Sequence, residues 1–209
     1  MAMTYGNLTG DKTVPGSIKS WVNYAKVDAE NVLMDAQTTL YQTLRVREMK
    51  STVTLSITAG QDNWAVPDGF MTFSKFLDVT NGCEIEHKSW DDLEWLRDWN
   101  NGDLVAGDPT YCSFYNEKIE FDVKTARAIT GRLSFYKMPA LLSSTNPSNF
   151  LCTRYPHLLR TACLAMAAVH FKDNVTYAQE IQRMSALVVG VNAQNDLDDH
   201  AGQDIQMIG

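Results

Sequence analysis

The spacing of apolar residues changes from helical to strand-like and back again along the chain. From residue 16 to residue 51, apolar side chains recur at steps of three and four, which predicts one long amphipathic helix with Ser17 as its N-cap. Between residues 52 and 145, apolar and polar residues alternate in short runs separated by turn residues. Such alternation predicts β-strands that are buried on one side.

The helical period returns after residue 146. The segment 149–171 predicts a helix in which Tyr155-Pro156 marks either a kink or a new helix start. Residues 158–169 are apolar almost all round, so we expect them to be buried. A last helix carries a stripe of apolar residues, namely Tyr177, Ile181, Met184, Leu187, Val188 and Val191.

This order of elements predicts an α+β fold. We expect a long N-terminal helix and two C-terminal helices packed as a helical bundle, with an inserted antiparallel β-sheet or β-barrel-like subdomain. The expected parts are an N-terminal arm (1–15), a helical domain (16–51 and 146–192), a β-rich insertion (52–145) and a C-terminal tail (193–209). The helical core should join two apolar faces: Val22, Ala29, Val32, Leu33, Ala36 and Leu40 against Leu158, Leu159, Ala162, Leu164, Ala165, Ala168 and Val169.

Composition narrows the class of protein. The 209 residues are 44% hydrophobic, which is typical of a globular chain. A net charge of −7 argues against a nucleic-acid binder, which needs a basic face to neutralise phosphates. The four cysteines lack C-x-x-C spacing, so we expect free thiols and not a zinc site. No apolar run reaches the length of a membrane span, and residues 1–20 lack the apolar segment of a signal peptide, which predicts synthesis in the cytoplasm.

Charge is unevenly distributed along the chain. Residues 84–108 hold eight acids and two bases, whereas residues 118–160 hold seven bases and two acids. Two readings are open: a solvated surface with chance clustering, or complementary faces that join copies of the chain. For the second reading, the candidate subunit-interface residues are Arg127, Arg132, Asp91, Asp92 and Glu94.

The search for catalytic, metal or cofactor chemistry gives only weak candidates, and we expect none of these sites. Four residues of the tail could bind a hard cation, namely Asp196, Asp198, Asp199 and His200, but a solvated acidic tail is favoured. Glu117 and Glu120 could form a carboxylate pair, but two solvent-facing charges on a strand are more common. Cys163 could form a dyad with His157 or His170, but core or interface roles are favoured for these residues. An aromatic cluster could stack on sugar rings, but packing of a small helix on a sheet is favoured for Trp90, Trp95 and Trp99.

Several short motifs resemble the tailed-bacteriophage adaptor, or head-to-tail connector, family. The motifs are Asn149-Phe150-Leu151, then Arg154-Tyr155-Pro156-His157-Leu158-Leu159, an Ala/Leu-rich helix, and Phe171-Lys172-Asp173. Two strand motifs agree, Trp64-Ala65-Val66-Pro67-Asp68-Gly69-Phe70 and Arg132-Leu133-Ser134-Phe135-Tyr136-Lys137-Met138-Pro139-Ala140. The resemblance spans residues 16–190. It departs from the family at His157 and Gly69, where Asp is usual, and in the acidic, Trp-rich stretch 89–110.

The resemblance implies a structural virion protein of the neck, with no enzymatic activity and no cofactor. Members form a ring, usually a dodecamer, that docks on the portal protein, surrounds the DNA channel and presents a platform for tail nozzle, tail tube or tail fibre proteins. Genomic DNA would pass without specific binding, and no membrane is involved. Candidate portal-docking residues are Tyr177, Ile181, Met184, Val188 and Val191 on the last helix, and Ile205, Met207 and Ile208 in the tail. The alternatives are another tail-completion or baseplate component, or a glycan-binding module.

Overall fold

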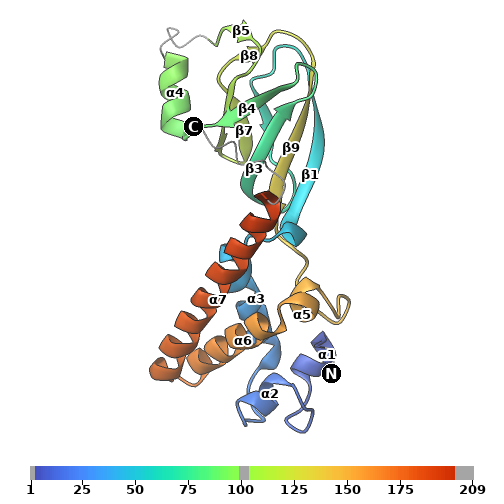
Figure 1. Ribbon diagram of the computed structural model, residues 1–209, viewed down its shortest axis with the longest axis vertical. Coiled ribbons are helices and arrows are strands. Elements are labelled where there is room, and N and C mark those ends of the chain that lie inside the picture. Colours follow the sequence, from blue (N-terminus) through green and yellow to red (C-terminus); the bar gives the residue numbers. More distant parts are fainter. Residues whose placement is uncertain (1–2, 99–103, 201–209) are drawn as a thin grey trace, which may run out of the picture. The chain divides into compact units, whose positions relative to one another are not determined.

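The computed structural model describes residues 3–98 and 104–200. The chain divides into two compact units, one formed by Met1–Glu48 with Pro139–Gly209 and the other by Met49–Met138. Figure 1 shows that the first unit consists of helices and that the second holds the β-strands and one helix. Each unit is described separately below.

The N-terminal third of the helical unit is broken into short helices. The described arm contains α1 (Tyr5–Thr9), and α2 (Ile18–Trp21) is separated from α3 (Ala29–Thr43) by an irregular segment. Asn23 in that segment has a positive φ of 54°, and Asp28 then caps a new helix by accepting from the backbone N–H of Asn31. These local signals interrupt the apolar period, so the prediction of one long N-terminal helix is wrong.

The C-terminal half of the helical unit contains α5 (Phe150–Arg154), α6 (Pro156–His170) and α7 (Asn174–His200). Pro156 stands at the first turn of α6, which resolves the choice between a kink and a new start in favour of the new start. α7 continues to His200, past the point at which the sequence predicted a tail. The unit combines short and long helices and is not the predicted bundle headed by a long N-terminal helix.

α6 packs against both α3 and α7. Most of the expected core residues are buried, among them Leu33 and Leu40 on α3 and Leu159 and Ala165 on α6. Val169 differs, because its side chain is 54% exposed, and Leu164 is only half-buried. The buried amide of Gln37 accepts from the backbone N–H of Leu142 at 2.7 Å, which holds the polar loop before α5 against α3.

The β unit is built around a seven-stranded sheet in the order β1-β9-β3-β4-β6-β7-β2. A 3-10 turn, η1 (Arg47–Met49), leads into it. The strands are β1 (Lys50–Ile57), β2 (Asn63–Ala65), β3 (Phe70–Asp78), β4 (Cys83–His87), β6 (Tyr111–Tyr115), β7 (Lys118–Phe121) and β9 (Ile129–Lys137). A second pair joins β5 (Ala106–Gly107) to β8 (Lys124–Thr125).

The sheet is mixed, so the expected antiparallel insertion is also corrected. β4 and β6 run parallel, with Glu86 opposite Tyr111, because α4 (Trp90–Asp98) lies between them in the chain and forms a crossover. The other pairs in the sheet are antiparallel. The sequence indicated the strands but contained no signal for the direction in which β4 and β6 would pair.

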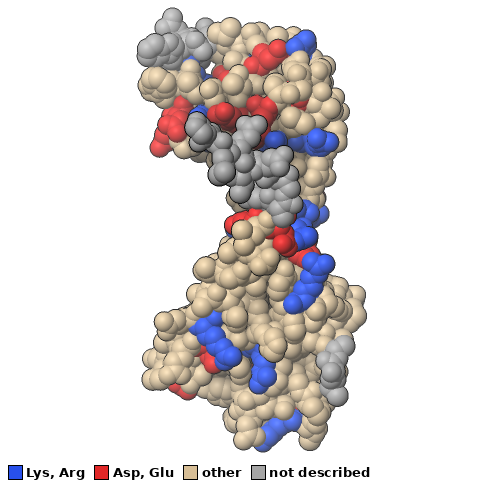
Figure 2. Space-filling model, in the orientation of Figure 1, with Lys and Arg blue, Asp and Glu red and all other residues tan. Residues whose placement is uncertain are grey.

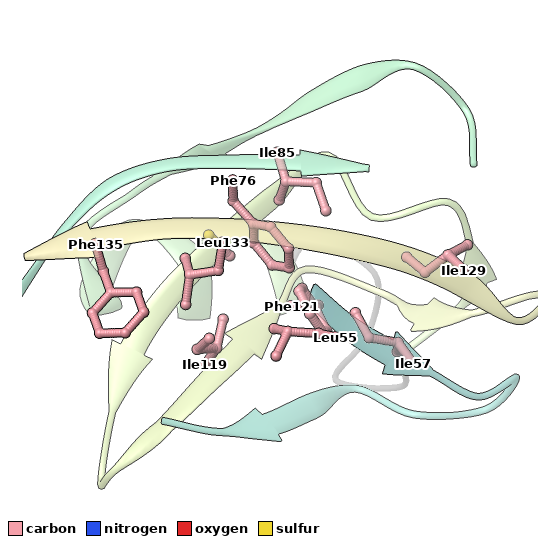
Figure 3. Packing of buried hydrophobic residues seen from close by; sticks show 10 residues of the cluster. Leu55, Ile57, Phe76, Ile85, Ile119, Phe121, Ile129, Leu133 and Phe135 are labelled. Atoms are coloured by element: carbon pink, nitrogen blue, oxygen red, sulfur yellow. The ribbon is translucent and has the colours of Figure 1, made fainter. Parts of the chain in front are cut away.

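Apolar side chains fill the interior of this nearly closed sheet, as Figure 3 shows for Phe76, Leu133 and Phe121. The connection after β1 bonds to the region of β7 and β8: the backbone N–H of Phe121 donates to the carbonyl of Asp62 at 2.8 Å. Gly131 on β9 makes room for the core, because a Cβ there would lie 2.5 Å from the ring of Phe76. Phe76 and Gly131 are therefore matched in size across neighbouring strands.

Candidate assembly surfaces

The last helix, α7, contains five of the predicted portal-docking residues. Met184 and Val188 are buried in this chain, where α7 packs on α6. Tyr177, Ile181 and Val191 are half-buried. The other three candidates, Ile205, Met207 and Ile208, lie outside the described residues. Docking through this helix stays a prediction, and the burial of Met184 and Val188 means that they stabilise α7 on its own unit.

The C-terminal part of α7 forms hydrogen bonds and an ion pair with the segment that follows α3. The side-chain carbonyl of Asn195 accepts from the backbone N–H of Arg47 at 3.2 Å, and its side-chain N–H₂ donates to the carbonyl of Val191 at 2.9 Å. Asp198 forms an ion pair with Arg47. Sequence reasoning missed this function of Asn195 and Asp198, although their spacing of three residues places them on one face of a helix.

The acidic stretch 84–108 has partners inside its own chain. Arg127, a predicted subunit-interface residue, pairs with Asp108 at 3.0 Å and donates to the side chain of Asn81 at 2.5 Å. Asp92 accepts from Ser89 at 2.6 Å at the start of α4. Figure 2 shows acidic side chains gathered on and beside α4. The charge asymmetry of the sequence is thus balanced in part within the β unit.

Three other predicted interface residues, Asp91, Glu94 and Arg132, are exposed. Among the described residues of one chain, neither Asp91 nor Glu94 forms an ion pair with Arg132. Their contact with a neighbouring copy therefore stays a prediction.

α4 is fastened to the sheet by an aromatic and cationic cluster. Trp90 stacks on Tyr115 with ring centroids 4.1 Å apart, and the guanidinium of Arg97 lies 5.6 Å from the ring of Trp90. Arg97 also pairs with Glu120 at 3.1 Å and donates to the carbonyl of Phe121. Trp90 is therefore engaged in packing, and Glu120 is a partner of Arg97 and not half of a carboxylate pair. Trp95 is 60% exposed, and Trp99 lies outside the described residues.

A groove of about 570 Å³ opens beside the β6–β7 hairpin. Its walls are the segment 65–70 and the hairpin 114–118. Phe70 and Phe114 stack at 4.6 Å and form its apolar side, whereas Asp68, Asn116 and Lys118 are polar. An apolar wall with a polar rim is typical of a binding surface for another protein or a small polar ligand.

The weak candidates for a Cys–His dyad, Cys163, His157 and His170, lie in different environments. Cys163 is buried, whereas His157 and His170 are exposed. Burial raises the pKa of Cys163, which disfavours the thiolate that a nucleophile needs. Within the described part of the chain, no group of three potential metal ligands is found. No helix among the described residues is both long and apolar enough to cross a membrane.

Comparison with known proteins shows the family of the chain. Residues 3–204 match the family model described as SU10 adaptor protein, and thus nearly the whole chain is covered. No curated protein matches the sequence.

Proposed function

The chain belongs to the SU10 adaptor protein family, and from that premise we propose that it is the head-to-tail adaptor of a tailed bacteriophage. In this proposal several copies, twelve in the usual case for such adaptors, form a ring below the portal protein in the virion neck. The ring surrounds the DNA channel, and its outer face is the platform for tail nozzle, tail tube or tail fibre proteins. The observation that carries the proposal is the family match over residues 3–204 of 209.

The protein would act through binding surfaces and not through catalysis. A net charge of −7 supports a channel wall that lets DNA pass without holding it, because an acidic surface repels the phosphates. The groove beside the β6–β7 hairpin is the surface that we assign to a tail component, since it combines aromatic and polar side chains outside the sheet core.

Two surfaces named by the sequence remain part of the proposal. Asp91, Asp92 and Glu94 of one copy would approach Arg132, and Arg127 where it leaves Asp108, on the next copy. Docking on the portal would use α7 together with the apolar residues Ile205, Met207 and Ile208 that follow it. Three apolar residues in an otherwise polar terminus support a buried contact with a partner.

The test is loading of purified protein onto portal-bearing heads that lack adaptor and tail. Wild-type protein should bind these heads and should not bind heads that lack the portal. Replacing Ile205, Met207 and Ile208 together by Ser should abolish loading, while the circular dichroism spectrum and the melting temperature stay unchanged. Replacing Gln203 and Gln206 by Ser is the matched control and should leave loading intact.

The outcomes separate the levels of the proposal. A wild-type protein that never loads onto portal-bearing heads would show that the adaptor function is wrong. Normal loading of the triple Ser variant would leave the adaptor function in place and would contradict only the docking role of the C-terminus.

A further inference from the structure

The exposed side of α3 is acidic and carries an exposed apolar residue. α3 contains no Lys or Arg, whereas Asp28, Glu30 and Asp35 lie at its N-cap and along its exposed side. Met34 lies one helical turn after Glu30 and precedes Asp35 in the sequence, and it is 48% exposed. We call these four residues the acidic face. An exposed Met beside carboxylates is a surface that a basic, partly apolar partner would cover.

The three carboxylates of the acidic face are not equally available. Asp28 caps the helix by accepting from Asn31, and Glu30 is hydrogen-bonded to the side chain of Tyr5. Asp35 makes no ion pair and no hydrogen bond to another side chain among the described residues. Its charge is thus the one that a partner can use without breaking a contact inside the chain.

A basic groove lies between α6 and α7. It has a volume of about 380 Å³ and is lined by His157, Arg160, Thr161, Leu164, Arg183 and Leu187. Its described lining contains no carboxylate. Leu164 and Leu187 give the basic groove an apolar part, and Figure 2 shows basic side chains interrupting a largely uncharged surface over α6 and α7.

The arginines of the basic groove are also available. Arg160 lies over the ring of Trp21 at 5.3 Å, which orients it but leaves its charge uncompensated. Over residues 3–98 and 104–200, neither Arg160 nor Arg183 forms an ion pair with a carboxylate. Arg183 and Asp35 are therefore opposite charges that the single chain leaves unpaired.

α6 packs against both α3 and α7, and the acidic face on α3 and the basic groove between α6 and α7 are separate surfaces. We infer that the acidic face of one copy docks in the basic groove of the next copy. Met34 enters between Leu164 and Leu187, and Asp35 meets Arg183. The inference rests on the proposed function, because it adds a contact between the helical units of neighbouring copies in the ring. A contact between two different surfaces repeats from copy to copy and closes when its rotation allows a ring.

The test uses two charge reversals in the head-loading assay. Asp35→Arg places a positive charge against Arg183, and Arg183→Glu places a negative charge against Asp35, so each variant alone should load about ten-fold less than wild type. Lys12→Glu, an exposed change of the same size outside both surfaces, is the control and should load normally. Circular dichroism and melting temperature confirm that each variant is folded.

The decisive measurement is a mixture of the two variants. Asp35→Arg copies and Arg183→Glu copies can alternate with attractive charges at every contact, so an equimolar mixture should regain loading, as should the double variant. Normal loading of either single variant, or failure of both the mixture and the double variant to recover, would overturn the contact while wild-type loading upholds the adaptor. If wild type itself does not load, the adaptor function fails and this contact fails with it.

Discussion

The side chain of Asn192 on α7 bonds to the backbone on both sides of Leu44, the C-cap residue of α3. Its carbonyl oxygen accepts from the backbone N–H of Arg45 at 2.8 Å, and its N–H₂ group donates to the backbone carbonyl of Thr43 at 3.1 Å. Leu44, between them, is extended and buried. One amide side chain thus satisfies two backbone groups that the end of α3 leaves without a helical partner.

Replacing Asn192 by Ala should destabilise the helical unit by about 1–3 kcal/mol, because the backbone N–H of Arg45 then loses its acceptor. Chemical denaturation measures the change. Gln182→Ala removes an exposed amide from the same helix and should change the free energy of unfolding by less than about 0.5 kcal/mol. Equal effects of the two substitutions would show that the contact of Asn192 contributes nothing.

The core between α3 and α6 gives a second contrast. Leu33 is 1% exposed, so Leu33→Ala should cost about 2–5 kcal/mol through lost burial and the cavity left behind. Val169→Ala removes fewer atoms, and the side chain that it shortens is 54% exposed, so it should lower the free energy of unfolding by less than about 0.5 kcal/mol. The denaturant midpoints of the two variants measure this difference. A large decrease for Val169→Ala would contradict the exposed position of Val169.

Asp122 predicts a pH dependence of the β unit. Burial raises the pKa of Asp122 above the ordinary value of 3.8, although backbone hydrogen bonds and Arg97 oppose the shift. The folded chain therefore binds the proton more tightly than the unfolded chain does. This contribution to stability is complete below pH 3.8 and is lost as the pH rises through the raised pKa of the folded state.

Asp122→Asn tests this, because the amide is neutral and its oxygen can still accept from the backbone N–H of Thr110, as the carboxylate does at 3.1 Å. Urea denaturation of both proteins across the acidic range should show the variant gaining stability relative to wild type as the pH rises above 3.8. A stability difference that is constant with pH would show that Asp122 has the same pKa in both states.

The cysteines should differ sharply in reactivity. Cys83 is exposed, whereas Cys112, Cys152 and Cys163 are buried. Burial raises the pKa of Cys112 to about 12, and it raises the pKa of Cys152 and Cys163 as well. A thiol-specific reagent at neutral pH should modify one thiol quickly in the native chain and all four after unfolding. Cys83→Ser should remove the fast phase, and a fast phase that survives would place a second thiol at the surface.

Local patterns were sufficient for much of the β unit. Alternation between residues 52 and 145 predicted half-buried strands. The structure places β3, β6, β9 and most of β1 in this segment, and Leu55 and Ile57 on β1 are buried. Pro156 marked either a kink or a new helix start, and the structure shows that α6 starts there. These features depend on residues that are close together in the sequence, so local patterns are sufficient to predict them.

The adaptor family was also indicated by short motifs around Tyr155-Pro156 and Trp64–Phe70, and the match over residues 3–204 confirms it. The motifs carried no information on which surfaces face a partner. In the β unit, Arg127 was read as an interface residue, yet it lies against Asp108, 19 positions earlier.

Tertiary structure decided the features that depend on distant residues. The sequence placed Asn192 at the end of a helix and Asn195 in a polar tail. The structure shows that their side chains accept hydrogen bonds from the backbone N–H groups of Arg45 and Arg47. The parallel pairing of β4 with β6 follows from the path of α4, which no local pattern specifies. A backbone group that lacks a local partner must find one somewhere, and the sequence states the need but not the residue that meets it.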